Sequence, residues 1–330
     1  MPSSYLNFRF HFIDLAGRAK PLFLLNGRID GESGLRLTEH SIPIEDIKQV
    51  YKYQDLIAII LKPYLALPKK LVENVLPETS ALLIKVADGF AFNVKSAIDQ
   101  HLSRLHAAQA KAKWEAEGKA SLFRTISCPV CEAIIDITAI CSEWIYCCYC
   151  ENIFNQYQQL LPKSEQYNIC PRCQYYGRLQ VYPEVKFFFW NRRFISSFEE
   201  NYICDTCAMR FYKENIWKNA IFLVGLPFSW YSKYLLTKEG DPTLTEMAQA
   251  NRLAQEGNMK EADVLYSTMM LRNERHIGLL YNYGLAWLQN DEPKKAFQYF
   301  SSVIELCNNY RPARQILEIY KKTTIEKTHL

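Results

Sequence analysis

Four Cys-x-x-Cys pairs constrain the fold of this 330-residue chain more than any other feature. Ten of its eleven cysteines lie between Cys128 and Cys207, and eight of them form the pairs Cys128/Cys131, Cys147/Cys150, Cys170/Cys173 and Cys204/Cys207. The N-terminus has no basic stretch followed by an apolar run, so we expect a reducing compartment, where paired cysteines are usually metal ligands. Two residues between thiolates let one tight turn offer both sulfurs to a tetrahedral ion. The eight thiolates therefore predict two closed, structural zinc sites.

The order of the pairs leaves two groupings open, sequential and nested. Fifteen residues separate Cys131 from Cys147 and nineteen separate Cys150 from Cys170, and both spacings suit a zinc ribbon. Local sequence favours the sequential grouping, because Cys-Pro-Val-Cys and Cys-Pro-Arg-Cys each precede a strand-like run, whereas the other two pairs each follow an aromatic and an apolar residue. The segment resembles two consecutive zinc ribbons. The first ribbon takes the pairs at 128/131 and 147/150, and the second takes those at 170/173 and 204/207.

The second ribbon departs from the usual spacing, and three cysteines lie outside the four pairs. Thirty residues lie between Cys173 and Cys204, which predicts an inserted loop or hairpin. Cys-Pro-x-Cys also occurs in thioredoxin-like redox proteins, where a helix follows and lowers the thiol pKa. Strand-forming residues follow here, so we favour metal binding. Cys141, Cys148 and Cys307 are expected to be small, buried side chains.

Charge argues against nucleic acid as the main partner. The chain has 39 Lys+Arg and 35 Asp+Glu, a formal net charge of +4. Residues 128–210 carry seven basic and nine acidic side chains, and four-thiolate zinc sites are themselves anionic. Such a surface releases few counterions on binding DNA or RNA. The stretch 185–194 mixes aromatic and basic residues, including Arg192 and Arg193, so it either stacks on single-stranded bases or packs as a strand beside the second zinc. A zinc-ribbon nucleic-acid-binding protein stays an alternative.

Residues 1–95 read as short strands followed by a helix. Phe8–Ile13 alternates apolar and polar residues, as a half-buried strand does. Further strands are expected at 21–28, 35–37, 41–51 and 56–61. We predict a hairpin of 81–86 and 90–94 around Asp88-Gly89, a favoured turn pair. A helix should then begin with Ser96 as its N-cap and end near Gly118.

Several strands closed by a C-terminal helix resemble pleckstrin-homology (PH) or GRAM-like domains, and the stretch 41–50, Ser-Ile-Pro-Ile-Glu-Asp-Ile-Lys-Gln-Val, is similar to a strand of that group. The resemblance implies lipid or peptide binding. Its headgroup position would be the first loop, with Arg18 and Lys20, and Arg28 nearby, as lipid or phosphate ligands. A plain interaction or structural domain is the competing interpretation.

An apolar segment and a helical repeat follow the cysteines. Asn219–Ser232 is too short to span a bilayer, so it is either a core segment or an interfacial membrane element. From Thr243 the chain becomes helical with a 34-residue period that aligns Ala250 with Gly284, Leu253 with Trp287, Ala262 with Ala296 and Tyr266 with Phe300. This resembles tetratricopeptide (TPR) repeats, with a capping helix over 311–322.

TPR arrays bind extended peptides along a concave face that is lined by the first helix of each repeat. Carried over residue by residue, the resemblance predicts a peptide-binding groove formed by Met247, Asn251, Tyr281, Asn282 and Leu285. Asparagine can bind a peptide backbone with both its donor and its acceptor. Some of these positions could instead pack against the preceding domain.

Together these predictions describe a multidomain α+β chain. Its parts are a PH/GRAM-like β domain with a long C-terminal helix (1–120), a tandem zinc-ribbon module (121–215), an apolar connecting segment (216–240) and all-α TPR-like hairpins with a capping helix (241–330). No Gly-rich phosphate loop, His-Glu-x-x-His or Gly-x-Ser-x-Gly motif is present, so we expect no enzyme. We predict a cytoplasmic adaptor or scaffold with two structural Zn²⁺ ions and protein partners. A peripheral membrane adaptor that binds lipid through its N-terminal domain is the other alternative.

Overall fold

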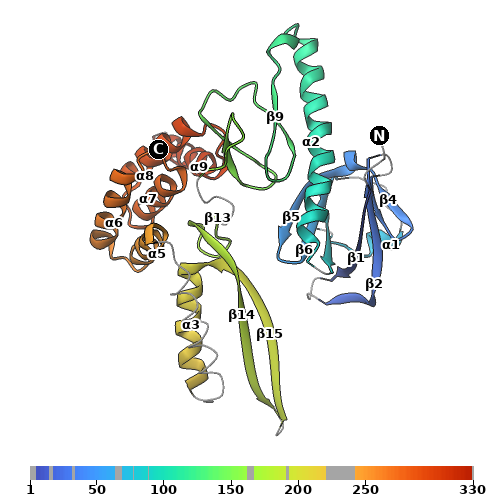
Figure 1. Cartoon of the computed structure of the whole chain (residues 1–330), viewed down its shortest axis with the longest axis horizontal. Coiled ribbons are helices and arrows are strands. Elements are labelled where there is room, and N and C mark those ends of the chain that lie inside the picture. The colour runs from blue at the N-terminus through green and yellow to red at the C-terminus, as the bar shows by residue number, and fades with distance from the viewer. Residues whose placement is uncertain are drawn as a thin grey trace. The chain divides into compact units, whose positions relative to one another are not determined.

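The computed structural model shows a multidomain α+β protein (Figure 1). An N-terminal antiparallel sheet carries a long helix, small sheets surround two four-cysteine groups, and helices form a C-terminal array. The structure describes residues 5–14, 18–31, 34–63, 69–76, 78–87, 89–161, 167–190, 193–220 and 242–328.

Contacts divide the chain into two compact units. The N-terminal unit comprises 1–139 together with Cys147–Cys150, and the C-terminal unit comprises Ile140–Tyr146 and 151–330. Each unit therefore contains one of the two four-cysteine groups. The boundaries expected at 120, 215 and 240 stay predictions.

The N-terminal unit is built on one antiparallel sheet with the order β4-β3-β2-β1-β8-β6-β5, and β7 pairs with β8. Apolar and polar residues alternate along its strands, as a half-buried sheet requires. In β1, Phe8, Phe10 and Phe12 point into the core between polar neighbours. The strands are β1 (Leu6–Ile13), β2 (Ala19–Asp30), β3 (Gly34–Leu37), β4 (His40–Ile42), β5 (Ile47–Tyr53), β6 (Leu56–Leu61), β7 (Val75–Leu76) and β8 (Ala81–Val86), with the short helix α1 (Lys69–Val72) before β7.

Helix α2 (Ala91–Ala116) corrects the predicted hairpin and N-cap. Gly89, at φ +71°, turns the chain from β8 directly into the helix, so 90–94 forms no second strand and Ser96 lies inside α2. The reason is a stripe of buried residues at helical spacing, Ala91, Val94, Ile98 and Leu102, which starts five residues before Ser96 and covers the sheet. The helix ends two residues before Gly118, close to the expected position.

Short hairpins carry the first cysteines. Strands β9 (Thr125–Ser127) and β10 (Ile134–Asp136) pair with each other, as do β11 (Trp144–Tyr146) and β12 (Ile153–Asn155). In the C-terminal unit, β13 (Tyr167–Ile169) pairs with β14 (Tyr176–Trp190), which forms a long ribbon with β15 (Arg193–Cys204). This ribbon is the insertion predicted between Cys173 and Cys204, and helix α3 (Asp205–Ala220) runs beside it (Figure 1).

The C-terminal array consists of two helical hairpins and a last helix. They are α5 (Pro242–Gln255) with α6 (Met259–Arg272), α7 (Ile277–Gln289) with α8 (Pro293–Leu306), and α9 (Arg311–Thr328). The residues aligned by the 34-residue period occupy equivalent core positions, since Ala262, Tyr266, Ala296 and Phe300 are fully buried. At Gly284 a Cβ atom would lie 2.8 Å from the Phe300 ring, so the small residue permits close packing of α7 on α8.

Two predicted segments fall wholly or partly outside the described residues. The apolar segment 219–232 lies there from residue 221 onward, and so does Arg192 of the aromatic-basic stretch. Among the helices described, none is long and apolar enough to cross a membrane.

Candidate metal centres

The first, second and third cysteine pairs share one kind of tight turn. After Cys131, Cys150 and Cys173 the next residue takes a left-handed conformation: Glu132 at φ +59°, Glu151 at +65° and Gln174 at +65°. In the first turn the Glu132 amide donates to the Cys128 carbonyl at 2.9 Å, and in the third the Gln174 amide donates to the Cys170 carbonyl at 2.8 Å. Glycine is the residue that most often marks a left-handed conformation, and none of these three positions is a glycine, so the sequence did not predict the left-handed residue of these turns.

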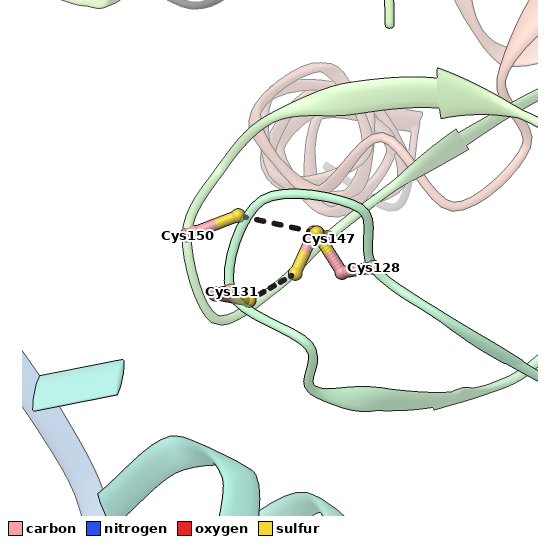
Figure 2. Close-up of side chains that lie close together, drawn as sticks. All are labelled: Cys128, Cys131, Cys147 and Cys150. Atoms are coloured by element: carbon pink, nitrogen blue, oxygen red, sulfur yellow. Dashed lines mark hydrogen bonds between the residues drawn. The ribbon is translucent and has the colours of Figure 1, made fainter. Parts of the chain in front are cut away.

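The first group has the geometry of a tetrahedral four-thiolate site. Its four sulfur atoms converge from the two turns (Figure 2) and all lie within 4.8 Å of one another. The Sγ atoms of Cys128 and Cys150 are 3.5 Å apart, and those of Cys131 and Cys147 are 3.6 Å apart. Metal–sulfur bonds of about 2.3 Å place tetrahedral ligands about 3.8 Å apart, whereas a disulfide needs about 2.05 Å. The spacing fits a metal ion and excludes a disulfide.

The second group is built differently from a simple ribbon. Cys170 and Cys173 lie in the turn between β13 and β14, but Cys204 ends β15 and Cys207 lies in the first turn of α3. The sulfur atoms are 3.9 Å apart for Cys170 and Cys207 and 3.6 Å apart for Cys173 and Cys204. Here the fourth pair uses a helix N-terminus, whose positive dipole end favours thiolates. The residues of both groups are those of the sequential grouping, not the nested one.

Local hydrogen bonds favour release of the first protons from each group. Bonds from Cys131 and the other two thiols lower the pKa of Cys128, and bonds from Cys173 and its companions lower the pKa of Cys170. Backbone amides add support, since Cys204 donates to Cys170 Sγ at 3.4 Å. Metal binding requires thiolates, so such donors assist it. Each group therefore could hold one metal ion with all four positions supplied by the protein.

Helix α2 supports the first group from the side. Ser96 Oγ and Gln100 Nε2 donate to the Cys131 carbonyl at 3.1 and 3.2 Å. Lys95 bonds the Tyr149 carbonyl, between Cys147 and Cys150, and also the carboxylate of Asp99. Burial raises the pKa of Asp99 to about 6, against the opposing charge of Lys95. The helix thus fixes both turns of the group.

The helical array supports the second group through the backbone of Tyr176, three residues beyond Cys173. Asn282 of α7 accepts a bond from the Tyr176 amide at 2.7 Å and donates one to its carbonyl at 2.7 Å. Asn282 is fully buried, and Asn251 of α5 adds a longer donor contact of 3.5 Å. At Gly278 a Cβ atom would lie 2.2 Å from the Tyr176 ring, so only glycine permits this approach. The array thus holds the start of β14 through its backbone.

A second asparagine makes the same pair of backbone hydrogen bonds with Tyr146, the last residue of β11. Asn309, between α8 and α9, accepts from the Tyr146 amide at 2.9 Å and donates to its carbonyl at 2.8 Å. The neighbouring Asn308 amide donates to Ser142 Oγ at 3.0 Å. Sequence reasoning missed Asn309. The only signal in the sequence was the adjacent pair Asn308-Asn309 between two predicted helices.

The predicted peptide groove is therefore not an open surface. Its five residues, Met247, Asn251, Tyr281, Asn282 and Leu285, are all buried. Asn251 and Asn282 bond the backbone of Tyr176, and the three other residues belong to the same buried cluster as Tyr175 and Tyr176, which lie just beyond Cys173. This corrects the expectation of an exposed groove and agrees with the alternative of packing against the preceding part of the chain.

The predicted phosphate-binding residues do not come together. Arg18 and Lys20 both pair with Asp14 at the β1–β2 turn, at 3.0 and 3.6 Å. Arg28 lies near the other end of this strand pair, opposite Asn7. Of the remaining cysteines, Cys307 is buried as expected, whereas Cys141 and Cys148 are exposed, and Cys148 lies within the turn between Cys147 and Cys150.

Comparison with known proteins adds no family. No family model, no curated protein and no solved structure matches the chain. What can be said of its function rests on the residues described above.

Proposed function

We propose that both four-cysteine groups hold structural Zn²⁺. All-sulfur tetrahedral sites suit zinc or iron, and structural zinc sites are closed in the way these are. Metal analysis of the purified chain is expected to give two zinc ions per molecule. A single zinc, or iron in place of zinc, would refute this assignment. Free cysteines that bind metal are typical of a reducing compartment, which supports a location such as the cytoplasm.

The protein as a whole is a non-enzymatic adaptor or scaffold for protein partners. The observation that carries this proposal is the backbone clamp of Asn282 on Tyr176, which joins the second metal centre to the helical array. Four thiolates leave no metal position for a substrate, so the ions stabilise the fold and perform no chemistry. A domain that metal ions stabilise in this way provides a rigid support for protein-binding surfaces.

Both flanking parts fit interaction domains. Two helical hairpins with a 34-residue period and a last helix support the likeness to TPR arrays. A continuous antiparallel sheet closed by α2 supports the likeness to PH/GRAM-like domains. Because the face of the array formed by α5 and α7 holds Tyr176, we assign the partner surface to the other helix of the first hairpin, α6. Val264 and Leu271 are two turns apart on one face of α6, with 65% and 81% of their surface exposed.

A crosslinked pull-down with the full, zinc-loaded chain tests this function. The variant V264S/L271S should lose a partner that the wild-type chain captures. V72S/L122S is the matched control, because these side chains of the N-terminal unit are 51% and 55% exposed. Loss with the control alone would move the interface to the N-terminal unit. Equal capture by all three proteins would refute the outer face of α6.

A further inference from the structure

Three arginines meet in a hollow on the outer face of the N-terminal sheet. Arg28 of β2 stands directly opposite Arg36 of β3, and Arg9 lies on the same face of β1, opposite Asn26. The alternating core residues of these strands, such as Phe8, Ile29 and Leu35, point the other way. The strand register, and not proximity in sequence, places the three arginines on one face, where all of them line the hollow.

The hollow has the size of a ligand site. Its volume is about 580 Å³, within the range of about 300–1,000 Å³ that is typical of small-molecule sites. Asn7 and Asn26 line it beside the arginines, and Phe90, which is 47% exposed, forms part of its wall. None of the described residues that line it is acidic. The hollow thus combines cations, amides and an aromatic edge.

Contacts within the chain orient two of the arginines. Arg28 Nε lies 3.3 Å from Asp30, and the Arg28 guanidinium stacks over the Tyr5 ring at 4.4 Å. Arg36 Nε donates to the Thr38 carbonyl at 3.1 Å. The ion pair of Arg28 and the hydrogen bond of Arg36 both use Nε, and within the described part of the chain the terminal nitrogens of these two arginines have no ion pair or hydrogen bond. The guanidinium groups of Arg28 and Arg36 are therefore held in place, and their terminal N–H donors can bind a ligand.

Placing like charges directly opposite across a strand pair destabilises a sheet. A bound anion would reverse the sign of that interaction. A phosphate monoester fits best, because it offers three acceptor oxygens and nearly two negative charges, and arginine forks bind phosphate with paired hydrogen bonds. We propose that the hollow formed by Arg9, Arg28 and Arg36 is a binding site for a phosphate monoester. The amides of Asn7 and Asn26 would then bond hydroxyl groups of the molecule that carries the phosphate.

Two probes separate the sources of such a phosphate. Glycerol 3-phosphate, titrated calorimetrically into the full zinc-loaded chain, represents a soluble ester. Phosphatidylcholine vesicles that contain phosphatidic acid represent the same group at a membrane, and vesicles with phosphatidylserine control for charge alone. Binding of glycerol 3-phosphate supports a soluble ligand, whereas binding only to phosphatidic acid vesicles supports a lipid headgroup.

Matched variants test the residues. R28Q/R36Q should lower the affinity for the bound probe at least about tenfold, since hydrogen bonds to charged groups are strong. R18Q/K20Q removes the same charge from the β1–β2 turn and should change affinity less than about twofold. The R36Q variant should unfold at the same temperature as the wild-type chain or higher, which separates lost binding from lost folding. No binding of either probe, or equal losses in both double variants, would overturn the proposal.

Discussion

The two four-cysteine groups use the same ligands but differ in how the chain supports them. The first joins two tight turns, and α2 braces it through part-buried donors to the Cys131 carbonyl. The second joins one tight turn to the N-terminus of α3, and the array braces it through the fully buried Asn282. Asp205 of α3 also pairs with Arg178 of β14 at 2.9 Å, which fastens the helix to the ribbon. Four Cys-x-x-Cys pairs therefore define ligands, while the surrounding elements define two different modules.

The largest effect should come from removing one ligand of either group. Cys128→Ser should release the first metal only, and Cys204→Ser the second only. Structural zinc contributes about 10–16 kcal/mol of apparent binding free energy, so each loss should unfold the module around that group. Metal analysis should give one zinc per chain in each variant. Hydrogen exchange should show lost protection around β9–β10 for the first variant and around β13–β14 for the second. Two zinc ions retained in either variant would contradict the ligand assignment.

Removing a supporting side chain from each group should show that the second group depends more strongly on its support than the first. Asn282→Ala leaves the buried amide of Tyr176 unpaired and leaves its carbonyl with only the longer Asn251 contact, so it should destabilise the C-terminal unit by about 3 kcal/mol. Gln100→Ala should cost the N-terminal unit about 1 kcal/mol or less, because Ser96 still bonds the same carbonyl. Hydrogen exchange resolved by segment measures both. Equal effects would mean that the two groups are braced alike.

The array should also make the C-terminal unit sensitive to acid through His276. This residue caps α7, where the Leu279 amide donates to its Nδ1 at 3.2 Å, and its ring meets the edge of Tyr176. Burial lowers the pKa of His276 to about 4. Above pH 6.5 the ring is neutral in the folded and unfolded states, so the full stability is present. Between about pH 6.5 and 4 only the unfolded chain takes up the proton, and stability falls by up to about 3 kcal/mol.

His276→Asn isolates this contribution from acid release of the metal. Asparagine is a good N-cap and does not titrate, so the variant should keep the cap. Chemical denaturation at a series of pH values should show the wild-type chain losing stability relative to the variant below pH 6.5. Parallel curves for the two proteins would contradict the predicted pH dependence.

The smallest expected effect distinguishes a tight turn from a helix start. Glu132→Gly should stabilise the N-terminal unit by about 1 kcal/mol, because glycine adopts the left-handed conformation without strain. Ala208, the corresponding residue after Cys207, lies in α3, so Ala208→Gly should destabilise by about 1 kcal/mol. Thermal unfolding of the zinc-loaded variants measures both. Shifts in the same direction would mean that the fourth pair is a turn like the others.

Features set by local spacing could be predicted from the sequence, whereas features set by the packing of distant segments could not. Ligand identity follows from spacing, and the 34-residue period places small and large core residues in register, so both could be read in advance. The turn at Gly89 was misread, because a favoured hairpin pair also suits entry into a helix, and the apolar stripe from Ala91 decides the outcome. The register that gathers Arg9, Arg28 and Arg36 could not be read from residues that lie far apart in the chain.

The eight cysteines, their sequential grouping and the helical repeat could all be predicted from the sequence, because they depend on residues close together in the chain or on a regular period. The fold was needed to show that the two four-cysteine groups belong to different units and that residues at the start of β14 pack against α5 and α7 of the array. Asn282 lies 106 residues from Tyr176, and Asn309 lies 163 from Tyr146. An asparagine amide can bind any exposed backbone with equal geometry, so its partner is chosen by the fold and not by local sequence.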